Sequence, residues 1–187
     1  MTGLAAGGSA SADRGSVRGL VASRLREIPD YPVPGVTFRD FTPLLADGAA
    51  LATVVAEIAE RFAGRVDVVA GIEARGFMIG TAAAVGLGVG FVPIRKAGKL
   101  PAPCVSASYD LEYGSATIEM HRDAFPPGTR VLLIDDVLAT GGTALAACRL
   151  VDEVGGLVVA VDVVVEIAGL GGRERLAGRT VESLLVV

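Results

Sequence analysis

The sequence contains few of the residues that build metal centres or disulfide frameworks. Its 187 residues include two cysteines, one histidine and no tryptophan. Cys104 and Cys148 stand far apart, and no second Cys or His lies at the spacing of metal ligands. We therefore expect neither a metal ion held by the protein nor a disulfide, and we expect a reducing compartment, the cytoplasm. His121 follows a short predicted strand, and we assign it no role.

Long apolar runs and an excess of positive charge are also missing. No apolar run reaches the roughly 18 residues needed to span a bilayer, and residues 1–15 lack the basic start and apolar centre of a secretory signal. The net charge is -4, which gives no general attraction to nucleic acid or to anionic membranes. We expect neither partner, and we expect residues 1–15 to form a disordered extension.

Aliphatic residues dominate what is present. The chain is 51% apolar but only 5% aromatic, and its length suits one domain, placed at residues 16–187, that buries roughly 70% of its unfolded surface. Strand and helix patterns alternate from residue 50 to 167, which predicts an α/β fold with a mostly parallel central sheet flanked by helices. The expected helices are 16–28, 47–63, 77–85 and 144–154, and the expected strands are 66–70, 89–94, 116–120, 131–134, 157–167 and 182–187.

The most informative stretch spans residues 131–144. Its first four branched apolar residues, Val131–Ile134, are typical of a strand buried on both faces. Asp135 and Asp136 follow, then an Ala-Thr-Gly-Gly-Thr loop at 139–143, and then apolar residues at helical spacing. A loop at the carboxyl end of a parallel strand is where open α/β sheets bind ligands.

The chemistry of this loop suits a sugar phosphate. Backbone N–H groups and the positive end of a helix dipole favour a phosphate, Gly141 and Gly142 allow close approach of the backbone, and Thr140 and Thr143 add hydroxyl donors. The two carboxylates would repel a phosphate alone, but they accept hydrogen bonds from sugar hydroxyls. The alternative is a strand-to-helix turn without a ligand, in which the acids merely cap the helix.

The same stretch resembles the phosphoribosyl-pyrophosphate signature of the type I phosphoribosyltransferases: an apolar strand, paired acids and a Thr-Gly-Gly-Thr loop. The resemblance implies the fold of that family, with a flexible hood loop. Neither standard nucleotide fingerprint is present to compete with this interpretation. The residues that the resemblance assigns to phosphoribosyl pyrophosphate are Asp135, Asp136, Ala139, Thr140, Gly141, Gly142 and Thr143.

A second loop after a predicted strand, residues 71–77, would provide another anion site close to the first if the two strands are neighbours. The planar guanidinium of Arg75 matches phosphate oxygens in pairs. We therefore assign Arg75 to the pyrophosphate and to catalysis. The family resemblance also implies a cis peptide bond between Glu73 and Ala74.

A basic cluster follows the strand predicted at 89–94. Arg95, Lys96 and Lys99 fall within five residues, and a basic cluster at a strand end is where an acidic protein would bind a polyanion. We assign Lys96 and Lys99 to phosphoribosyl pyrophosphate. The alternative is a solvated surface loop.

The proline-containing segment before residue 40 is incompatible with a helix. By itself it would be a stiff surface connector, but Pro-Gly-Val-Thr-Phe-Arg-Asp-Phe-Thr-Pro-Leu-Leu, starting at Pro34, resembles a stretch specific to the adenine phosphoribosyltransferases. That resemblance implies that Phe38 stacks on the purine, that the backbone at Arg39 meets the purine edge, and that Ile167 contacts the opposite purine face.

Residues 100–116 lack sustained periodicity and are predicted to form a long loop, which is typical of a lid or a disordered segment. Residues 107–114 resemble the mobile hood of the adenine enzymes. The resemblance assigns Glu112 as a catalytic acid or base and Tyr113 as part of the cover over phosphoribosyl pyrophosphate. The alternative is a hairpin in which Glu112 is only a solvated carboxylate.

The strand end at 162–167 contains no lysine, whereas the acceptor at position 6 of an oxopurine is well served by a lysine donor. The absence of this donor favours adenine over an oxopurine. Together with the family resemblance, it predicts purine salvage by pentosyl transfer, a glycosyltransferase activity that makes AMP and pyrophosphate from adenine and phosphoribosyl pyrophosphate. The expected cofactor is Mg²⁺, bound mainly by substrate and water, and family members are commonly homodimers. The alternatives are transfer to another base and a regulator that binds the same ligand without chemistry.

Overall fold

The computed structural model describes residues 9–31, 33–110 and 115–187. The contacts divide the chain into two compact units, residues 1–57 and 58–187. The prediction of one domain over residues 16–187 stays a prediction. No helix in the described ranges is long and apolar enough to cross a membrane.

The first unit pairs a small antiparallel sheet with helices. It contains α1 (Ser9–Arg24), β1 (Arg26–Ile28), β2 (Phe38–Asp40), α2 (Thr42–Ala46) and the start of α3 (Gly48–Phe62). Ile28 of β1 pairs with Phe38 of β2, so the prediction of a helix through Ile28 was wrong. Pro29 explains the error, because the residue before a proline is driven to an extended conformation. The predicted helix start at Ser16 was also wrong, since α1 already includes residues 9–15; residues 1–8 lie outside the described ranges.

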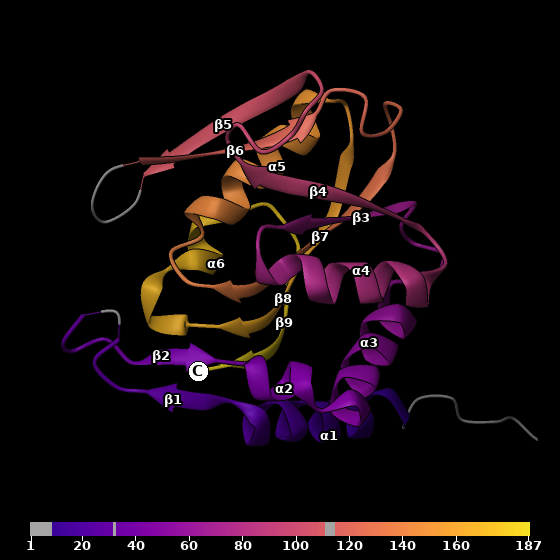
Figure 1. The fold of residues 1–187 in the computed structure, drawn as a ribbon. Coiled ribbons are helices and arrows are strands. Elements are labelled where there is room, and N and C mark those ends of the chain that lie inside the picture. The colour runs from indigo at the N-terminus through magenta and orange to yellow at the C-terminus, as the bar shows by residue number, and fades with distance from the viewer. Residues whose placement is uncertain (1–8, 32, 111–114) are drawn as a thin grey trace, which may run out of the picture. The chain divides into compact units, whose positions relative to one another are not determined.

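The second unit is built on one sheet with strand order β5-β6-β4-β3-β7-β8-β9 (Figure 1). The pairs β4–β3, β3–β7, β7–β8 and β8–β9 are parallel, and β4–β6 and β5–β6 are antiparallel. The predicted mostly parallel sheet flanked by helices is therefore confirmed. The strands are β3 (Val68–Ile72), β4 (Gly90–Lys96), β5 (Cys104–Asp110), β6 (Ser115–His121), β7 (Arg130–Leu138), β8 (Leu157–Glu166) and β9 (Val181–Val186), and the helices are α4 (Arg75–Leu87), α5 (Gly142–Glu153), η1 (Ala168–Leu170) and α6 (Gly172–Arg175).

The two main helices of this unit cover opposite faces of the sheet. Helix α4 connects β3 to β4 on one side of the centre, and α5 connects β7 to β8 on the other side. Because parallel crossovers are right-handed, connections that run in opposite directions place their helices on opposite faces. The direction changes between β3 and β7, and ligands of open α/β sheets bind at such a switch point.

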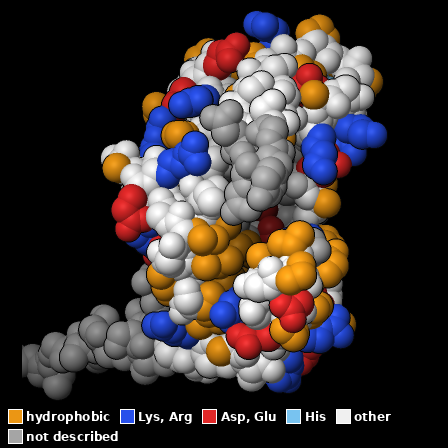
Figure 2. Space-filling view, turned by 90° about the vertical axis from the view of Figure 1, so that its left-hand side faces the viewer, with side chains coloured by type: hydrophobic (Ala, Val, Ile, Leu, Met, Phe, Trp, Pro, Cys, Tyr) orange, Lys and Arg blue, Asp and Glu red, His pale blue; other side chains and the backbone are white. Residues whose placement is uncertain are grey.

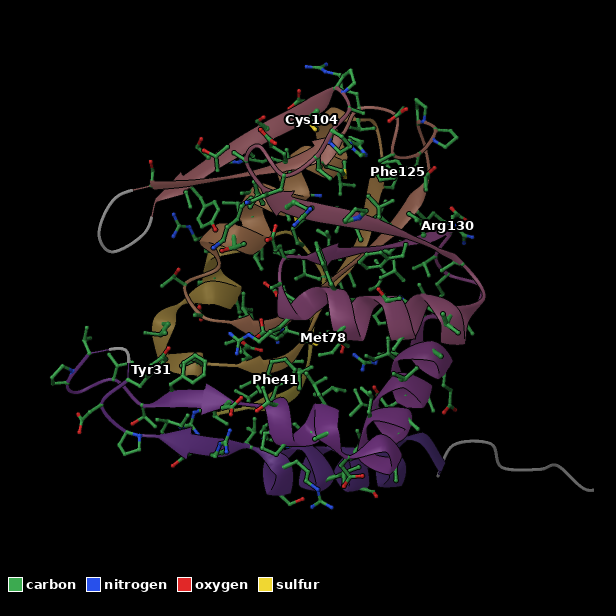
Figure 3. The ribbon with its side chains drawn as sticks, in the orientation of Figure 1. Tyr31, Phe41, Met78, Cys104, Phe125 and Arg130 are labelled. Atoms are coloured by element: carbon green, nitrogen blue, oxygen red, sulfur yellow. The ribbon has the colours of Figure 1, made fainter. Side chains whose placement is uncertain are left out.

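The core of this unit fills both faces of the sheet (Figure 3). Val131, Leu132, Leu133 and Ile134 are at most 1% exposed, as expected of a central strand covered on both sides. β7 extends past them through both acids to Leu138, which is longer than predicted. The strand predicted at 131–134 thus lies at the centre of the hydrophobic core.

The prediction of a long loop over 100–116 was wrong for its described part, which includes strand β5 and the start of β6. Cys104 pairs with His121 and Asp110 with Ser115, so these strands form an antiparallel hairpin. Small residues hid the alternation: Val105 is buried, whereas Ser106 and Ser108 are exposed. Residues 111–114, between these two strands in the sequence, lie outside the described ranges.

Candidate active site

The loop between β7 and α5 leaves a helix N-terminus open to a ligand. Gly141 precedes the helix with a φ of 77°, and no side chain of the described residues caps it. The first helical hydrogen bond runs from the Leu145 N–H to the Gly141 carbonyl, at 2.9 Å. The N–H groups of residues 142–144 therefore precede the helical ladder, which makes this end suitable for an anion.

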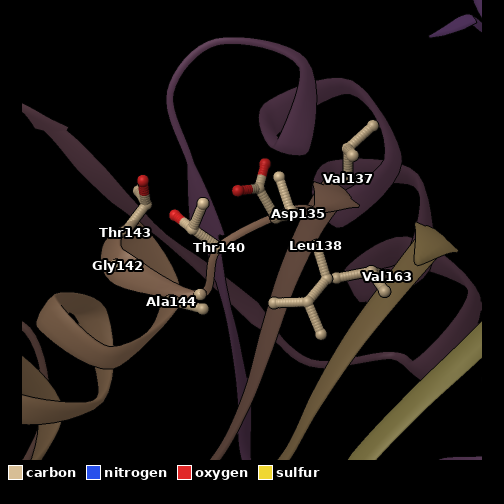
Figure 4. Close-up of a pocket in the computed structure, with 10 residues that line it drawn as sticks. Asp135, Val137, Leu138, Thr140, Gly142, Thr143, Ala144 and Val163 are labelled. Atoms are coloured by element: carbon tan, nitrogen blue, oxygen red, sulfur yellow. The ribbon is translucent and has the colours of Figure 1, made fainter. Parts of the chain in front are cut away.

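A pocket lies over this loop (Figure 4). The side-chain oxygens of Asp135, Thr140 and Thr143 point to the same side, which combines hydroxyl donors with a carboxylate acceptor. The volume of the pocket, about 70 Å³, is far below that of a pocket for a whole ligand. It suits a single small group such as a phosphate. The lining residues are Asp135, Val137, Leu138, Ala139, Thr140, Gly141, Gly142, Thr143, Ala144 and Val163.

The paired acids have different surroundings. Asp135 lines the pocket, and its Oδ1 accepts a hydrogen bond of 2.9 Å from the Asp136 N–H. Burial, followed by the charge of Asp136, raises the pKa of Asp135 well above its usual range, and Arg75 opposes this rise. The Asp136 carboxylate is 3.0 Å from the Arg75 guanidinium, in an ion pair. Hydroxyl donors from a ligand would favour the ionised form of Asp135.

The loop after β3 is bonded to the end of β4. The Glu73 N–H donates to the Ile94 carbonyl at 2.9 Å, and the Glu73 carboxylate accepts from the Lys96 N–H at 3.0 Å and from Arg95 Nε at 3.2 Å. The Lys96 N–H, followed by Arg95, lowers the pKa of Glu73 against the opposing effect of burial. The peptide bond between Glu73 and Ala74 is cis, as the resemblance implied.

Lys96 is the last residue of β4 and Lys99 lies on the loop after it, and both are exposed. They are the only lysines in the sequence. Arg95 Nη1 donates a hydrogen bond of 3.0 Å to the Lys99 carbonyl, which links the loop after β4 to the end of that strand. On the face that Figure 2 shows, Lys and Arg side chains form separate groups and not one continuous basic surface.

The sheet brings these loops to one edge. β3 lies between β4 and β7, with Ile72 beside Ile94 and Gly71 beside Ile134. The loops that follow the three strands therefore meet at the same carboxyl edge, and the Arg75–Asp136 ion pair joins the start of α4 to the end of β7. The structure thus assembles Asp135, Asp136, Arg75 and the residues 139–143 in one place.

The residues predicted for the purine belong to different units. Ile167 is half-buried, and its N–H donates to the Leu138 carbonyl at 2.9 Å, so it lies beside the end of β7. Phe38 and Arg39 lie on β2 of the first unit. The rings of Tyr31 and Phe38 meet edge-on, with their centroids 5.2 Å apart, and Arg39 forms an ion pair with Glu27. The joint purine site stays a prediction. Glu112 and Tyr113 lie outside the described residues.

The sequence analysis missed Gly76, which follows Arg75 in the first turn of α4. A Cβ at Gly76 would lie 2.8 Å from the Ile134 carbonyl oxygen and 3.1 Å from Asp135 Oδ1. Only a glycine allows α4 to approach the acid pair so closely. A glycine inside a helix is disfavoured, and its presence beside Arg75 was the available signal.

Comparison with known proteins agrees with this geometry. Residues 43–180 match the phosphoribosyl transferase domain. The chain is 55% identical over 169 residues to an adenine phosphoribosyltransferase of Thermobifida fusca, covering 90% of this chain and 96% of the relative. It is 56% identical over 170 residues to the one of Salinispora tropica, covering 90% of each.

Solved structures give the same result. The crystal structure of adenine phosphoribosyltransferase from Thermoanaerobacter pseudethanolicus is similar with a TM-score of 0.87 and 43% identity, covering 91% of this chain and 99% of that one. The enzyme from Saccharomyces cerevisiae, in complex with adenine and an imino-altritol bisphosphate, has a TM-score of 0.87 and 37% identity over the same shares.

Proposed function

The chain belongs to the phosphoribosyltransferase family and groups with its adenine enzymes, and we propose that it transfers the phosphoribosyl group of phosphoribosyl pyrophosphate to adenine. The products are AMP and pyrophosphate, in a reaction of purine salvage. The observation that carries this proposal is the pocket over residues 139–143, which combines an uncapped helix N-terminus with an acid pair. That combination suits a ligand with both a phosphate and a diol.

The sugar is bound at both ends in this proposal. The backbone N–H groups of residues 142–144 and the hydroxyls of Thr140 and Thr143 bind the 5-phosphate. Asp135 and Asp136 accept hydrogen bonds from the 2- and 3-hydroxyls. Both ends are then held in one orientation, and positioning of this kind supplies much of the catalysis when little covalent chemistry is required of the protein.

The leaving pyrophosphate requires positive charge. Arg75, already at the acid pair, and the exposed Lys96 and Lys99 would supply it from neighbouring loops. Mg²⁺ would be held mainly by pyrophosphate oxygens and water, near Asp135 and Asp136. When bound, Mg²⁺ would neutralise charge on the leaving group.

Adenine would lie between Phe38 and Ile167, with its edge against the backbone at Arg39. Adenine presents an amino donor at position 6, which a backbone carbonyl satisfies and a lysine does not. The absence of lysine from residues 162–167 supports adenine over an oxopurine.

Glu112 would act as the acid or base and Tyr113 as part of the cover that excludes water. Glu112→Ala is expected to lower kcat roughly 10²- to 10⁴-fold, the usual contribution of a positioned acid or base, with little change in substrate binding. Steady-state kinetics and calorimetry on the same preparation test this. Activity within a few-fold of the unmodified protein would remove the assignment.

We also propose a homodimer in the cytoplasm. Met78, labelled in Figure 3, and Val85 are 48% and 77% exposed on α4. Exposed apolar side chains on one helix support a protein interface. Cys104 and Cys148 are both free thiols, which suits a reducing compartment. Sedimentation velocity tests the dimer, and a single species of monomer mass at micromolar concentration would contradict it.

The direct test of the function is an assay with purified protein, adenine, phosphoribosyl pyrophosphate and Mg²⁺. AMP and pyrophosphate should form in equal amounts. Guanine, hypoxanthine, xanthine and orotate serve as competing bases, and each should react much more slowly. No AMP at any substrate level would overturn the proposal, and faster use of another base would correct the substrate.

A further inference from the structure

The loop at residues 139–143, here called the phosphate-binding loop, packs against the first turn of α6. Two glycine backbones meet at this contact. A Cβ at Gly141 would lie 2.7 Å from the Gly172 carbonyl oxygen and 3.1 Å from Gly172 Cα. A Cβ at Gly172 would lie 2.3 Å from the Ala139 carbonyl oxygen and 2.9 Å from Leu138 Cγ. The loop and α6 are therefore in backbone contact from both sides.

The two glycines are required for different reasons. Gly141 has a φ of 77°, which only glycine adopts without strain, and it also lacks room for a side chain. Gly172 needs no positive φ, so lack of space alone excludes a side chain there. The atom in the way is a backbone oxygen of the loop, and it cannot rotate aside as the end of a side chain could. A methyl group at Gly172 would thus displace Ala139 and, with it, the loop.

An ion pair beside this contact fixes α6 in place. Arg173 donates to both carboxylate oxygens of Glu166, at 2.8 and 2.5 Å, and to the Val181 carbonyl at 2.8 Å. Ser183 Oγ adds a bond of 2.9 Å to Glu166, which is only 5% exposed. Glu166 is the last residue of β8 and pairs with Leu138 of β7. Both sides of the glycine contact are therefore anchored to the same strand end.

We propose that Gly172 and the Arg173–Glu166 pair are positioning residues for the phosphate-binding loop. Gly172 fixes the position of Ala139 and Gly141, which line the pocket, and the ion pair holds Gly172 in place. This inference rests on the proposed function, because it assigns a role within the binding of phosphoribosyl pyrophosphate.

The test compares Gly172→Ala with Gly169→Ala. Gly169 lies three residues earlier in η1, with no atom within 4 Å of its Cβ position and no positive φ, so its variant controls for loss of a glycine in this segment. Calorimetry with ribose 5-phosphate and kinetics with both substrates are the readouts. Gly172→Ala should raise the Kd for ribose 5-phosphate and the KM for phosphoribosyl pyrophosphate at least about 10-fold, and the KM for adenine much less. Gly169→Ala should match the unmodified protein.

The outcomes separate this inference from the function itself. If the unmodified protein binds ribose 5-phosphate and Gly172→Ala binds it equally well, the inference is wrong and the function stands. If Gly172→Ala weakens both substrates equally while its Tm falls, its role is only structural and the inference is also wrong. If the unmodified protein neither binds ribose 5-phosphate nor forms AMP, the proposed function and the inference fall together.

Arg173 variants decide the matter if Gly172→Ala does not fold. Arg173→Ala should raise the KM for phosphoribosyl pyrophosphate several-fold with a smaller change for adenine, and Arg173→Lys should recover part of the loss because it keeps a charge near Glu166. An unchanged KM in Arg173→Ala, or no difference between the two variants, would refute the role of the ion pair.

Discussion

The loops after β7 and after β3 are built alike but present opposite chemistry. Each follows a parallel strand at the same edge of the sheet and leads into a helix. The β7 loop presents a pocket of backbone, hydroxyls and the Asp135 carboxylate, with no side-chain cap on α5. The β3 loop leads to the Arg75 guanidinium at the start of α4, and its Glu73 is bonded to the end of β4.

The difference shows how one structural unit can serve two parts of one ligand. Recognition by backbone depends on close approach, so it tolerates no added side-chain atoms. Recognition by side-chain charge depends on the distance between the charges and on the ionic strength. The affinity should therefore fall gradually as charges are removed. The ion pair between Arg75 and Asp136, at 3.0 Å, connects the helix that follows the β3 loop to the strand that precedes the β7 loop.

Gly141→Val should have the largest effect, because it breaks the backbone site. The new side chain meets the Gly172 carbonyl and demands a positive φ from a branched residue. We expect the affinity for ribose 5-phosphate to fall at least about 100-fold, since displacement by about 1 Å costs this much. Calorimetry measures it. Gly178→Val is the control, because Gly178 also has a positive φ but no atom within 4 Å of its Cβ position. Equal affinity in both variants would contradict the assignment of the loop.

Arg75→Ala should have the opposite selectivity. The affinity for pyrophosphate should fall roughly 10- to 100-fold, as expected from loss of hydrogen bonds to a charged group, whereas that for ribose 5-phosphate should change much less. The Tm should also fall, because Asp136 is 7% exposed and loses this ion pair. Arg149→Ala removes an exposed charge on α5 and serves as the control. A larger loss for ribose 5-phosphate than for pyrophosphate would reverse the comparison.

Asp135→Asn should lower the affinity for ribose 5-phosphate roughly 10-fold, which is the contribution of one hydrogen bond to a charged acceptor. It should also stabilise the empty protein at neutral pH. The pKa of Asp135 is raised by burial and by Asp136, so the folded state holds an additional proton between the usual pKa of 3.8 and the raised pKa. In that window the free energy of unfolding falls as pH rises.

The Tm advantage of Asp135→Asn should therefore grow as pH rises above about 4 and become constant once the wild-type carboxyl has ionised. Thermal melts in a pH series of constant ionic strength measure this advantage. Asp123→Asn, at an exposed carboxylate, is the control. An advantage that is constant across the series would show that Asp135 does not carry the extra proton.

Lys99→Ala should have the smallest effect. Lys99 is exposed, so its contribution is screened by salt. We expect a rise of about two- to fivefold in the KM for phosphoribosyl pyrophosphate at low salt, which disappears near 0.5 M salt. Kinetics at several salt concentrations test this. A salt-independent loss larger than that of Arg75→Ala would place the pyrophosphate on the β4 loop instead.

The hydrophobic pattern predicted secondary structure correctly where consecutive residues are all buried. Val131–Ile134 form a continuous apolar run, and burial on both faces of a sheet requires such a run. The pattern failed where small polar residues form an edge strand, as in Cys104–Asp110, and where Pro29 ends a helical periodicity at Ile28. Local patterns of this kind are weak because strand pairing with distant residues decides the outcome.

The sequence by itself determined the parallel α/β class and the order strand, acid pair, glycine loop, helix, since these depend on residues close together in the chain. Only the tertiary structure decided that Arg75 pairs with Asp136 and that Glu73 is bonded to the end of β4. It also decided that Gly172 lies against Ala139. These contacts follow from strand order and register, which bring distant segments within a few ångströms, and no local pattern encodes which segments will meet.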